Sequence, residues 1–361
     1  MGTKLNIEEA HGTIEIKRGI SIKKESVYGT PIGNSDINKA IEVEGLMPFH
    51  PKAEVYDNKL LIGKGHEWIT RQKLLRWLGT DFPEIVFQSN QLTDAFYLAM
   101  ALGGYSVGDV EVGVFLHKIT VSDLATGGRV PRSTTSIQSL IPGEDYKIYG
   151  EIVEGITVTF DRKELVKTAV RLRNSGKIEK ITGYNYPTLS PLYFFPAANI
   201  NFKMAPVGDP LRNVNEIISE VVFNFNDEFG DTIPYYPGGP TQHEAEGQVA
   251  GKQLIKSRNA GITVRLYDTE EYWRKKYRAN KPFALVIECR TDEKIGATEK
   301  YYEMDLLFNS LAPTNLTHDA IDDFSGVTLE FEPAPFSSAT QASMLEILIQ
   351  NDVEEYLLAA S

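Results

Sequence analysis

Two stretches of this sequence have nearly the same pattern of residues, and the pattern is that of a β-strand. Glu154–Asp161 has the sequence EGITVTFD, and Ser325–Glu332 has the sequence SGVTLEFE, so Gly155 and Gly326 stand 171 residues apart. At the same ungapped offset QSLIP (138–142) matches NSLAP (309–313), and VFLHKIT (114–120) matches LVIECRT (285–291). β-Rich chains often look alike in short windows, but three matches at one spacing favour an internal duplication.

The length of the chain agrees with a duplicated plan. A chain of 361 residues is too long for one ordinary core and fits two domains of roughly 150 residues each. Composition shifts and turn-rich stretches predict four parts: an N-terminal arm (1–38), a first domain (39–208), a second domain (209–335) and a C-terminal amphipathic helix (336–361). The boundary between the two domains is expected near Gly208–Arg212.

Most of each half has strand-like alternation of β-branched and aromatic residues, which predicts a mainly β fold. Each half also contains one short helical pattern. In LTDAFYLAMALGG, Thr93 can cap the helix and Gly103 can end it. In DTEEYWRKKYRANKP, Asp268 and Glu271 resemble a capping box, and Pro282 blocks continuation.

The C-terminal segment has apolar residues at a spacing that predicts one stripe of a helix. The predicted stripe consists of Met344, Leu345, Leu348, Ile349, Val353, Tyr356 and Leu357.

Charge and cysteine content exclude several classes of protein. The net charge of −12 argues against a protein that grips nucleic acid through its phosphates, although not against one that lets nucleic acid pass by. The single cysteine, Cys289, lies in an apolar run and predicts a buried thiol in a reducing compartment. No run approaches the roughly 20 apolar residues that span a bilayer, and the N-terminus lacks a signal-peptide pattern.

Motifs for chemistry are weak throughout the sequence. His243-Glu244 lacks the second histidine of a zinc-protease helix, and the other five histidines do not cluster. GQVAGKQ (247–253) resembles a phosphate loop only in its glycines. NFNDEFGD (224–231) has Phe229 where a calcium loop needs glycine, so a strand that ends in a polar turn is the better interpretation. We therefore predict no catalytic residue, no metal site and no cofactor, and a protein that is not an enzyme.

Two aromatic segments are candidates for contact surfaces. Tyr184, Tyr186, Tyr193, Phe194 and Phe195 lie in the bridge between the halves, where they can stack on a sugar or seal two domains or subunits. The basic segment HEWITRQKLLRWLG (66–79) is expected to pack on a neighbour rather than to contact nucleic acid.

The order of these elements resembles that of the tail tube proteins of long-tailed bacteriophages and related viruses. The stretches that carry the resemblance are KESVYGTPI (24–32), IEVEG (41–45), the helix LTDAFYLAMALGG, VFLHKIT, RVPRSTTSIQSL (129–140) and YKIYGEIVEGITVTF (146–160). Together they cover Lys23 to Arg162. The second half is linked to the family mainly through the duplication.

The resemblance implies two tandem β-sandwich or barrel-like domains, each with a flanking short helix. It also implies a virion protein, assembled in the host cytoplasm, that forms rings which stack into a hollow tail tube for viral DNA. Because related single-domain proteins form rings of six, a duplicated chain is expected to need three copies, a trimer with pseudo-sixfold symmetry. Expected partners are other tail proteins (terminator, tape measure, baseplate or tip). No membrane contact is expected.

Three alternatives stay open at this point. A carbohydrate-binding or carbohydrate-cleaving β-sandwich protein would need a pair of carboxylates facing an aromatic groove. The second is another virion component, such as a capsid or tail-terminator protein; a tail terminator would stay a single ring rather than form a stack. An injection tube of a contractile secretion system is a further relative of the tail tube.

Overall fold

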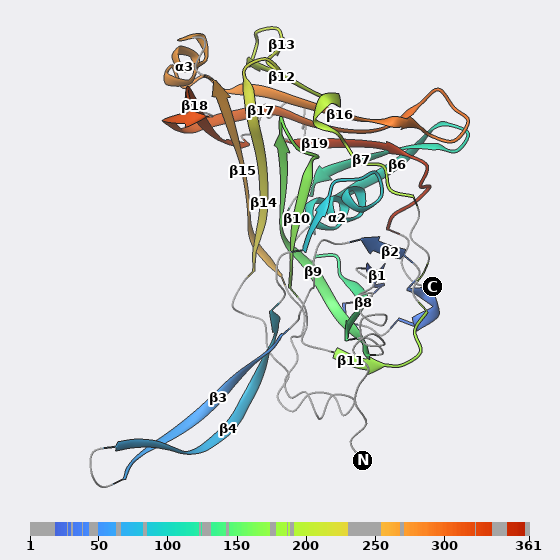
Figure 1. Cartoon of the computed structure of the whole chain (residues 1–361), viewed down its shortest axis with the longest axis vertical. Helices are drawn as coiled ribbons and strands as arrows, with labels where there is room; N and C mark the ends of the chain where they lie inside the picture. The colour runs from blue at the N-terminus through green and yellow to red at the C-terminus, as the bar shows by residue number, and fades with distance from the viewer. Residues whose placement is uncertain are drawn as a thin grey trace, which may run out of the picture.

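Figure 1 shows the computed structural model of the chain. The structure describes residues 19–26, 28–29, 32–37, 39–42, 50–62, 66–81, 85–122, 124, 131–141, 144–173, 178–185, 187, 191–229, 254–267, 271–321, 323–333 and 345–357. Of 19–21, 39–42, 50–62, 66–81, 139–141, 144 and 178 it describes the backbone alone.

The prediction of a mainly β protein is confirmed, because strands dominate the described residues and almost all of them belong to antiparallel sheets. The strands of the first half are β1 (Gly19–Lys24), β2 (Lys39–Glu42), β3 (His50–Ile62), β4 (His66–Asp81), β5 (Ile85–Gln88), β6 (Gly103–Glu111), β7 (Val114–Val121), β8 (Thr134–Ile141), β9 (Glu144–Asp161), β10 (Lys167–Arg173) and β11 (Ile178–Ile181). Those that follow are β12 (Ile200–Pro206), β13 (Arg212–Asn213), β14 (Ile218–Phe229), β15 (Ile255–Tyr267), β16 (Phe283–Lys294), β17 (Tyr301–Ile321), β18 (Phe324–Pro333) and β19 (Leu345–Asn351). Two short 3-10 turns, η1 (Asn34–Asp36) and η3 (Ala197–Asn199), lie between them.

Two large layers of strands enclose the main core. One layer runs in the order β5, β10, β9, β14, β15, β18, β17, and we call it the long sheet. The other runs β13, β12, β16, β17, β19, β7, β6, and we call it the cross sheet. In Figure 1 the strands of the cross sheet run across the upper part, over the steep strands β14, β15 and β10. β17 contributes to both layers, so it forms a corner between them.

A third, smaller set of strands pairs in the order β2, β1, β8, β9, β11 below the main core. β9 is its link to the long sheet. The first part of β9 pairs with β8 and β11, and the second part pairs with β10 and β14. Like β17, β9 is a long strand that belongs to two layers.

The two halves of the chain share one hydrophobic core. A row of fully buried side chains crosses the long sheet, from Val158 on β9 through Phe223 on β14 and Ile262 on β15 to Phe331 on β18. Because β9 pairs with β14 over seven registered positions, the joint between the halves is a continuous stretch of β-sheet. β12, which precedes the predicted boundary near Gly208, pairs with β16 across it.

The predicted first helix is α2 (Thr93–Leu102), and all ten of its residues are buried under the sheets. Gly103 ends it in the left-handed conformation at φ 85°, as its position predicts. The cap differs from the prediction: the Asn90 side chain accepts hydrogen bonds from the backbone N–H groups of Leu92 and Thr93, so Thr93 is the first helical residue. The second helix is α3 (Glu271–Arg278), while the predicted cap at Asp268 lies outside the described residues.

The predicted C-terminal helix (336–361) is wrong over its described residues, 345–357. Leu345, Ile347 and Ile349 are buried and alternate with the less buried Glu346 and Leu348, which is the period of a strand. This strand, β19, fills the place between β17 and β7 and pairs with both. The helical spacing of the apolar residues is therefore overridden by the pairing that the two neighbouring edges supply.

The described part of the predicted N-terminal arm also belongs to the fold. Residues 1–18 lie outside the described residues, but β1 pairs with β2 and β8. Ile22 is fully buried, and the Glu25 carboxylate accepts hydrogen bonds from the Ser133 and Thr135 hydroxyls. The sequence of this segment does not predict a strand because it is polar and turn-rich and few of its residues are buried.

Candidate functional site

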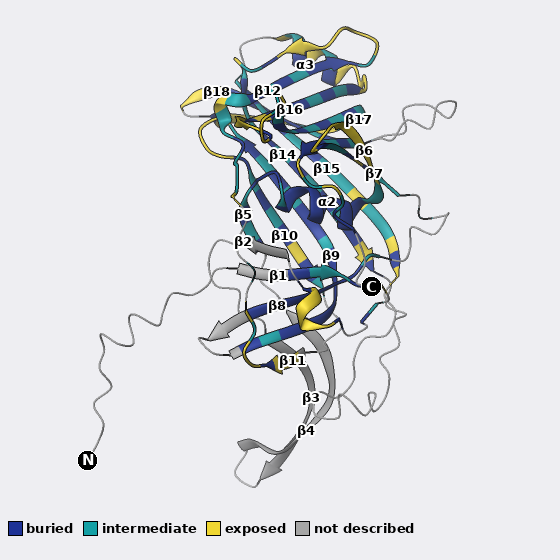
Figure 2. Cartoon of the chain, turned by 90° about the vertical axis from the view of Figure 1, so that its right-hand side faces the viewer, coloured by how far each residue is buried: buried dark blue, intermediate teal, exposed yellow. Residues whose placement is uncertain are grey.

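The long sheet has one apolar and one polar face. Along β14 and β15 the buried side chains alternate with half-buried ones, and Figure 2 shows this as alternating dark blue and teal bands. Strand alternation places every second residue on the side away from the core. The polar side chains on that side, which we call the polar face, are Lys167, Arg171, Thr157, Thr159, Asp161, Glu220, Asn224, Asn226, Glu228, Ser257, Asn259, Thr263, Arg265, Thr328, Glu330, Glu332, Asn315, Thr317 and Asp319.

Side chains on the polar face bind one another across neighbouring strands. The Thr157 hydroxyl donates a hydrogen bond to the Asn224 amide oxygen at 2.8 Å, which bridges the two halves of the chain. The Arg265 guanidinium lies 3.3 Å from Glu220 and 3.8 Å from Asp319. These are half-exposed ion pairs, worth little in stability.

The polar face is acidic on balance, because its carboxylates outnumber its lysine and arginine side chains two to one. A net negative wall repels other anions, phosphate groups included, at distances up to about 8 to 10 Å in physiological salt. Such a surface is suited to face polyanions without binding them.

Two polar side chains pack directly over Gly155 at the joint between the halves. A Cβ atom at Gly155 on β9 would lie 2.4 Å from the Asn226 amide oxygen and 2.8 Å from the Arg171 guanidinium. Arg171 donates a hydrogen bond to the same Asn226 oxygen at 2.6 Å. The glycine therefore leaves room for a polar bridge from β10 over β9 to β14.

One edge of the long sheet is open. From Asn315 to Ile321, β17 pairs with β18 and with no other strand in the described part of the chain. Thr317, His318, Asp319 and Ala320 are exposed there. Unpaired strand edges are places where a further strand can add by backbone hydrogen bonds. The open edge is thus a candidate contact surface of the protein.

A second candidate is a depression of about 530 Å³ on the outer side of the cross sheet. Its lining includes Glu288, Glu303 and Asp305. Burial raises the pKa of Asp305 to about 7, and the neighbouring Glu303 and Glu288 charges add to the rise. Burial also raises the pKa of Glu303. A carboxyl group that titrates near neutral pH has the property of a general acid or base.

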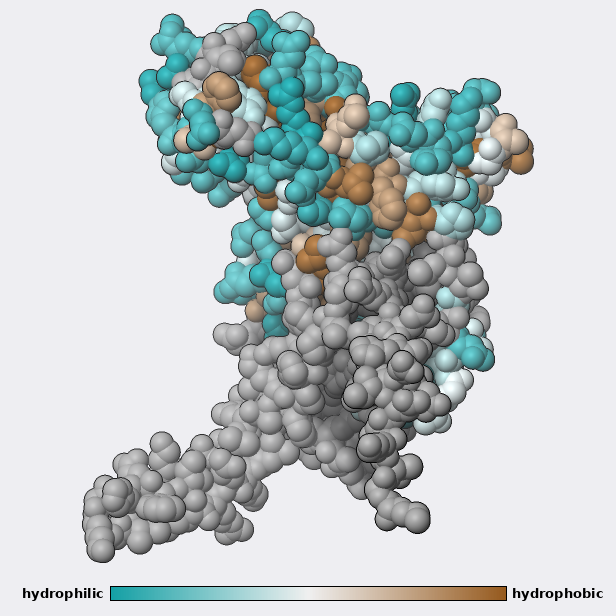
Figure 3. Space-filling view, viewed as in Figure 1, coloured by the Kyte–Doolittle hydropathy of each residue, from teal (hydrophilic) through white to brown (hydrophobic). Residues whose placement is uncertain are grey.

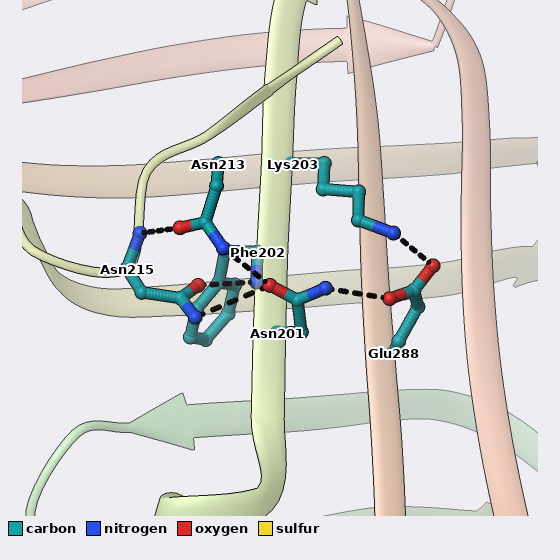
Figure 4. A network of polar contacts seen from close by, with 6 residues as sticks. All are labelled: Asn201, Phe202, Lys203, Asn213, Asn215 and Glu288. Carbon is teal, nitrogen blue, oxygen red and sulfur yellow. Dashed lines mark hydrogen bonds and ion pairs between the residues drawn. The ribbon is translucent and has the colours of Figure 1, made fainter.

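A network of polar side chains forms one side of this depression (Figure 4). Lys203 and Asn201 donate hydrogen bonds to the two oxygens of Glu288, at 2.6 and 2.7 Å. Burial acts to raise the pKa of Glu288, but these hydrogen bonds outweigh it and leave the pKa lowered. Asn213 and Asn215 donate in turn to the Asn201 amide oxygen. The network therefore joins β12, β13 and β16 through side-chain hydrogen bonds.

The depression does not have the form that the carbohydrate alternative requires, because none of its lining residues is aromatic. The aromatic residues of the bridge pack within the protein instead. Tyr193 stacks on Tyr302 with ring centroids 4.9 Å apart, Phe195 is buried in the main core, and the Tyr184 hydroxyl donates to the Ile37 carbonyl. They join parts of one chain, whereas Tyr186 lies outside the described residues.

The weak chemical motifs form no site within the described part of the chain. His243 and GQVAGKQ lie outside the described residues, and NFNDEF (224–229) belongs to strand β14, as predicted. His117 is buried in a structural cluster, where its ring nitrogens bond to the Tyr105 hydroxyl and the Asn351 amide oxygen. Among the described residues no three potential metal ligands come together, and no described helix has the length and hydrophobicity to cross a bilayer.

The sequence does not predict the polar face or the open edge as sites. One signal for the polar face is present in FNFN (223–226), where apolar and polar residues alternate. No protein-family model matches the sequence, and the search of curated proteins finds no match.

Proposed function

We propose that this protein is a structural virion protein that assembles side by side into rings, which stack into the hollow tail tube that carries viral DNA. The observation that carries the proposal is the long sheet, whose core-side face is apolar across both halves of the chain and whose other face is polar and acidic. The resemblance of Lys23 to Arg162 to tail tube proteins supplies the class of assembly.

In this proposal the polar face lines the lumen. Three chains of formal charge −12 each would give a ring with a formal charge of −36. DNA passes such a wall without adhering because its phosphates are repelled, whereas a basic wall would hold it by releasing counterions. The chain contributes two wall segments, one on each side of the β9–β14 joint, so three copies per ring replace six single-domain subunits.

The test is electron microscopy of the concentrated protein, with the mass of the assembly measured by light scattering on the same sample. Stacked rings with the mass of three chains per ring are the expected result. Rings of six chains would keep the tube and overturn the stoichiometry. A protein that stays in single, unstacked rings would instead indicate a tail-terminator or other virion component.

A carbohydrate-cleaving or carbohydrate-binding protein is the second candidate, favoured only by the titratable carboxyl group of Asp305 in the depression of the cross sheet. Its test is hydrolysis or binding of a panel of bacterial surface polysaccharides by the wild-type protein and by Asp305→Asn. Activity that the substitution removes would favour this candidate over the tube.

A further inference from the structure

The two halves of the chain repeat one order of strand pairing. In the first half the paired order is β5, β10, β9, β8, and in the second it is β15, β18, β17, β16, antiparallel throughout. In both halves a helix follows the first of these strands, α2 after β5 and α3 after β15. β9 and β17 therefore occupy the same place in the two halves.

The structural repeat differs from the 171-residue offset of the sequence matches. EGITVTFD lies in β9 and SGVTLEFE lies in β18, which are not equivalent in the pairing order. The equivalence of β9 with β17 rests instead on their partners. Each is a long strand whose first part pairs with two strands in one layer, and whose second part pairs with the following strand of the chain.

The second part of β9 has a partner on its other edge, and the second part of β17 does not. Gly155–Asp161 of β9 pairs with Glu220–Asn226 of β14, and Val158 and Phe160 are fully buried as a result. The equivalent edge of β17 is open among the described residues, and Thr317 and His318 there are exposed. The strand that closes the first edge comes from the second half of the same chain.

The first half contains a counterpart of β14. β4 and β5 follow one another along β10, with Asp81 opposite Arg173 and Ile85 opposite Val170, as the single strand β15 lies along β18. β3 pairs with β4 as β14 pairs with β15. Among the described residues β4 is the one strand with which β3 pairs.

We propose that the open edge of β17 in one copy of this chain binds β3 of the next copy, antiparallel, and so repeats between chains the β9–β14 joint inside the chain. The inference deepens the proposed tube function and rests on it, since it names the surfaces that join neighbouring subunits. The contact is head-to-tail: each copy offers one edge and one strand. Such contacts close into a ring when the rotation permits.

Side chains near the edge are suited to this contact. Leu316, His318 and Ala320 lie on the core side of β17, because they pair with Leu329, Val327 and Ser325 of β18. Leu316 already packs against the main core, whereas His318 and Ala320 are exposed. An added strand would extend the apolar layer over these two positions and remove them from water.

The first test uses lysine substitutions on the two faces of this edge. The full-length double variant His318→Lys/Ala320→Lys places two charges where the incoming strand would bury them. The matched control, Asn315→Lys/Thr317→Lys, adds the same charge to the same strand on the polar face, which stays in water. All four positions are half-exposed or exposed in the single chain, and circular dichroism checks that both variants fold.

Light scattering at matched concentrations should show assemblies for the wild type and the control, and at least a tenfold loss of assembly for His318→Lys/Ala320→Lys. Undiminished assembly of that variant would overturn the edge assignment and leave ring formation intact. Equal loss in both variants would overturn it too, because added charge alone would then explain the effect. A wild type that stays monomeric at high concentration would overturn both this inference and the proposed function.

A second measurement needs no substitution. Hydrogen exchange followed by mass spectrometry compares the amides of the dilute and the assembled wild-type protein. Exchange should slow at least tenfold in 315–321 and in 50–62 on assembly, since both edges gain hydrogen bonds. Unchanged exchange in 315–321 within an assembled sample would place the contact elsewhere and overturn the inference.

Discussion

Glu151 gives the sharpest prediction about stability. Its side chain is 1% exposed, on the part of β9 that pairs with β8. Burial raises its pKa from 4.5 to about 8, the Ser136 hydroxyl offsets a little of this, and the nearby Glu25 charge adds to it. Neither carboxyl oxygen has a hydrogen-bond partner of good geometry among the described residues. The folded protein therefore keeps this group protonated at neutral pH.

The sign of the effect follows from the two pKa values. The folded state holds the proton more tightly than the unfolded state, so the contribution of Glu151 to stability is complete below pH 4.5 and is lost as pH rises through 8. The variant Glu151→Gln cannot ionise. Between pH 5 and pH 9 the wild type should lose about 4 kcal/mol of unfolding free energy relative to this variant, at about 1.4 kcal/mol per pH unit of pKa difference.

Urea unfolding at a series of pH values, monitored by circular dichroism on dilute protein, measures this difference. The exposed Glu332→Gln serves as a control for the loss of one carboxylate, and its stability should follow the wild type across the range. If Glu151→Gln and the wild type change in parallel from pH 5 to pH 9, within about 0.5 kcal/mol, the assignment of a raised pKa to Glu151 is refuted.

Three further predictions concern buried groups. Cys289 is 1% exposed and burial raises its pKa, so a thiol reagent should fail to modify the native protein and modify one thiol per chain in denaturant; rapid native modification would contradict this. Asp227→Asn leaves the buried Arg258, 3.0 Å away, without its counter-ion. The free energy of unfolding in urea should fall by about 3 to 5 kcal/mol, whereas a fall of less than about 1 kcal/mol would show that water reaches the pair. Asn351→Ala removes a bond to His117 and should cost about 2 kcal/mol or more in the same assay; an unchanged midpoint would place β19 outside the cooperative unit.

The sequence predicts those elements whose signals are local. The first helix follows from its apolar content and from Gly103, which only needs its own backbone conformation to end the helix. The strand character of both halves follows from alternation and β-branched residues. These signals depend on a few neighbouring residues, so no knowledge of the tertiary structure is required.

Elements fixed by distant partners are harder to predict. Leu345 to Asn351 has apolar residues compatible with either a helix or a strand, and the edges of β7 and β17 decide in favour of the strand. The cap of α2 comes from Asn90, which a search for a capping residue directly before the helix overlooks. The open edge of β17 can be recognised only when the strand pairing of both halves is known, because the equivalent edge of β9 has a partner strand and that of β17 has none among the described residues.

The position of β19 has a consequence for the order of synthesis. This strand is the last described one in the chain, and it pairs with β7 of the first half and β17 of the second. On a ribosome, β7 and β17 emerge before Leu345 to Asn351 leave the exit tunnel, and the cross sheet cannot close until then. The edges of β7 and β17 therefore stay uncovered in the nascent chain until Leu345 to Asn351 have entered the middle of the sheet.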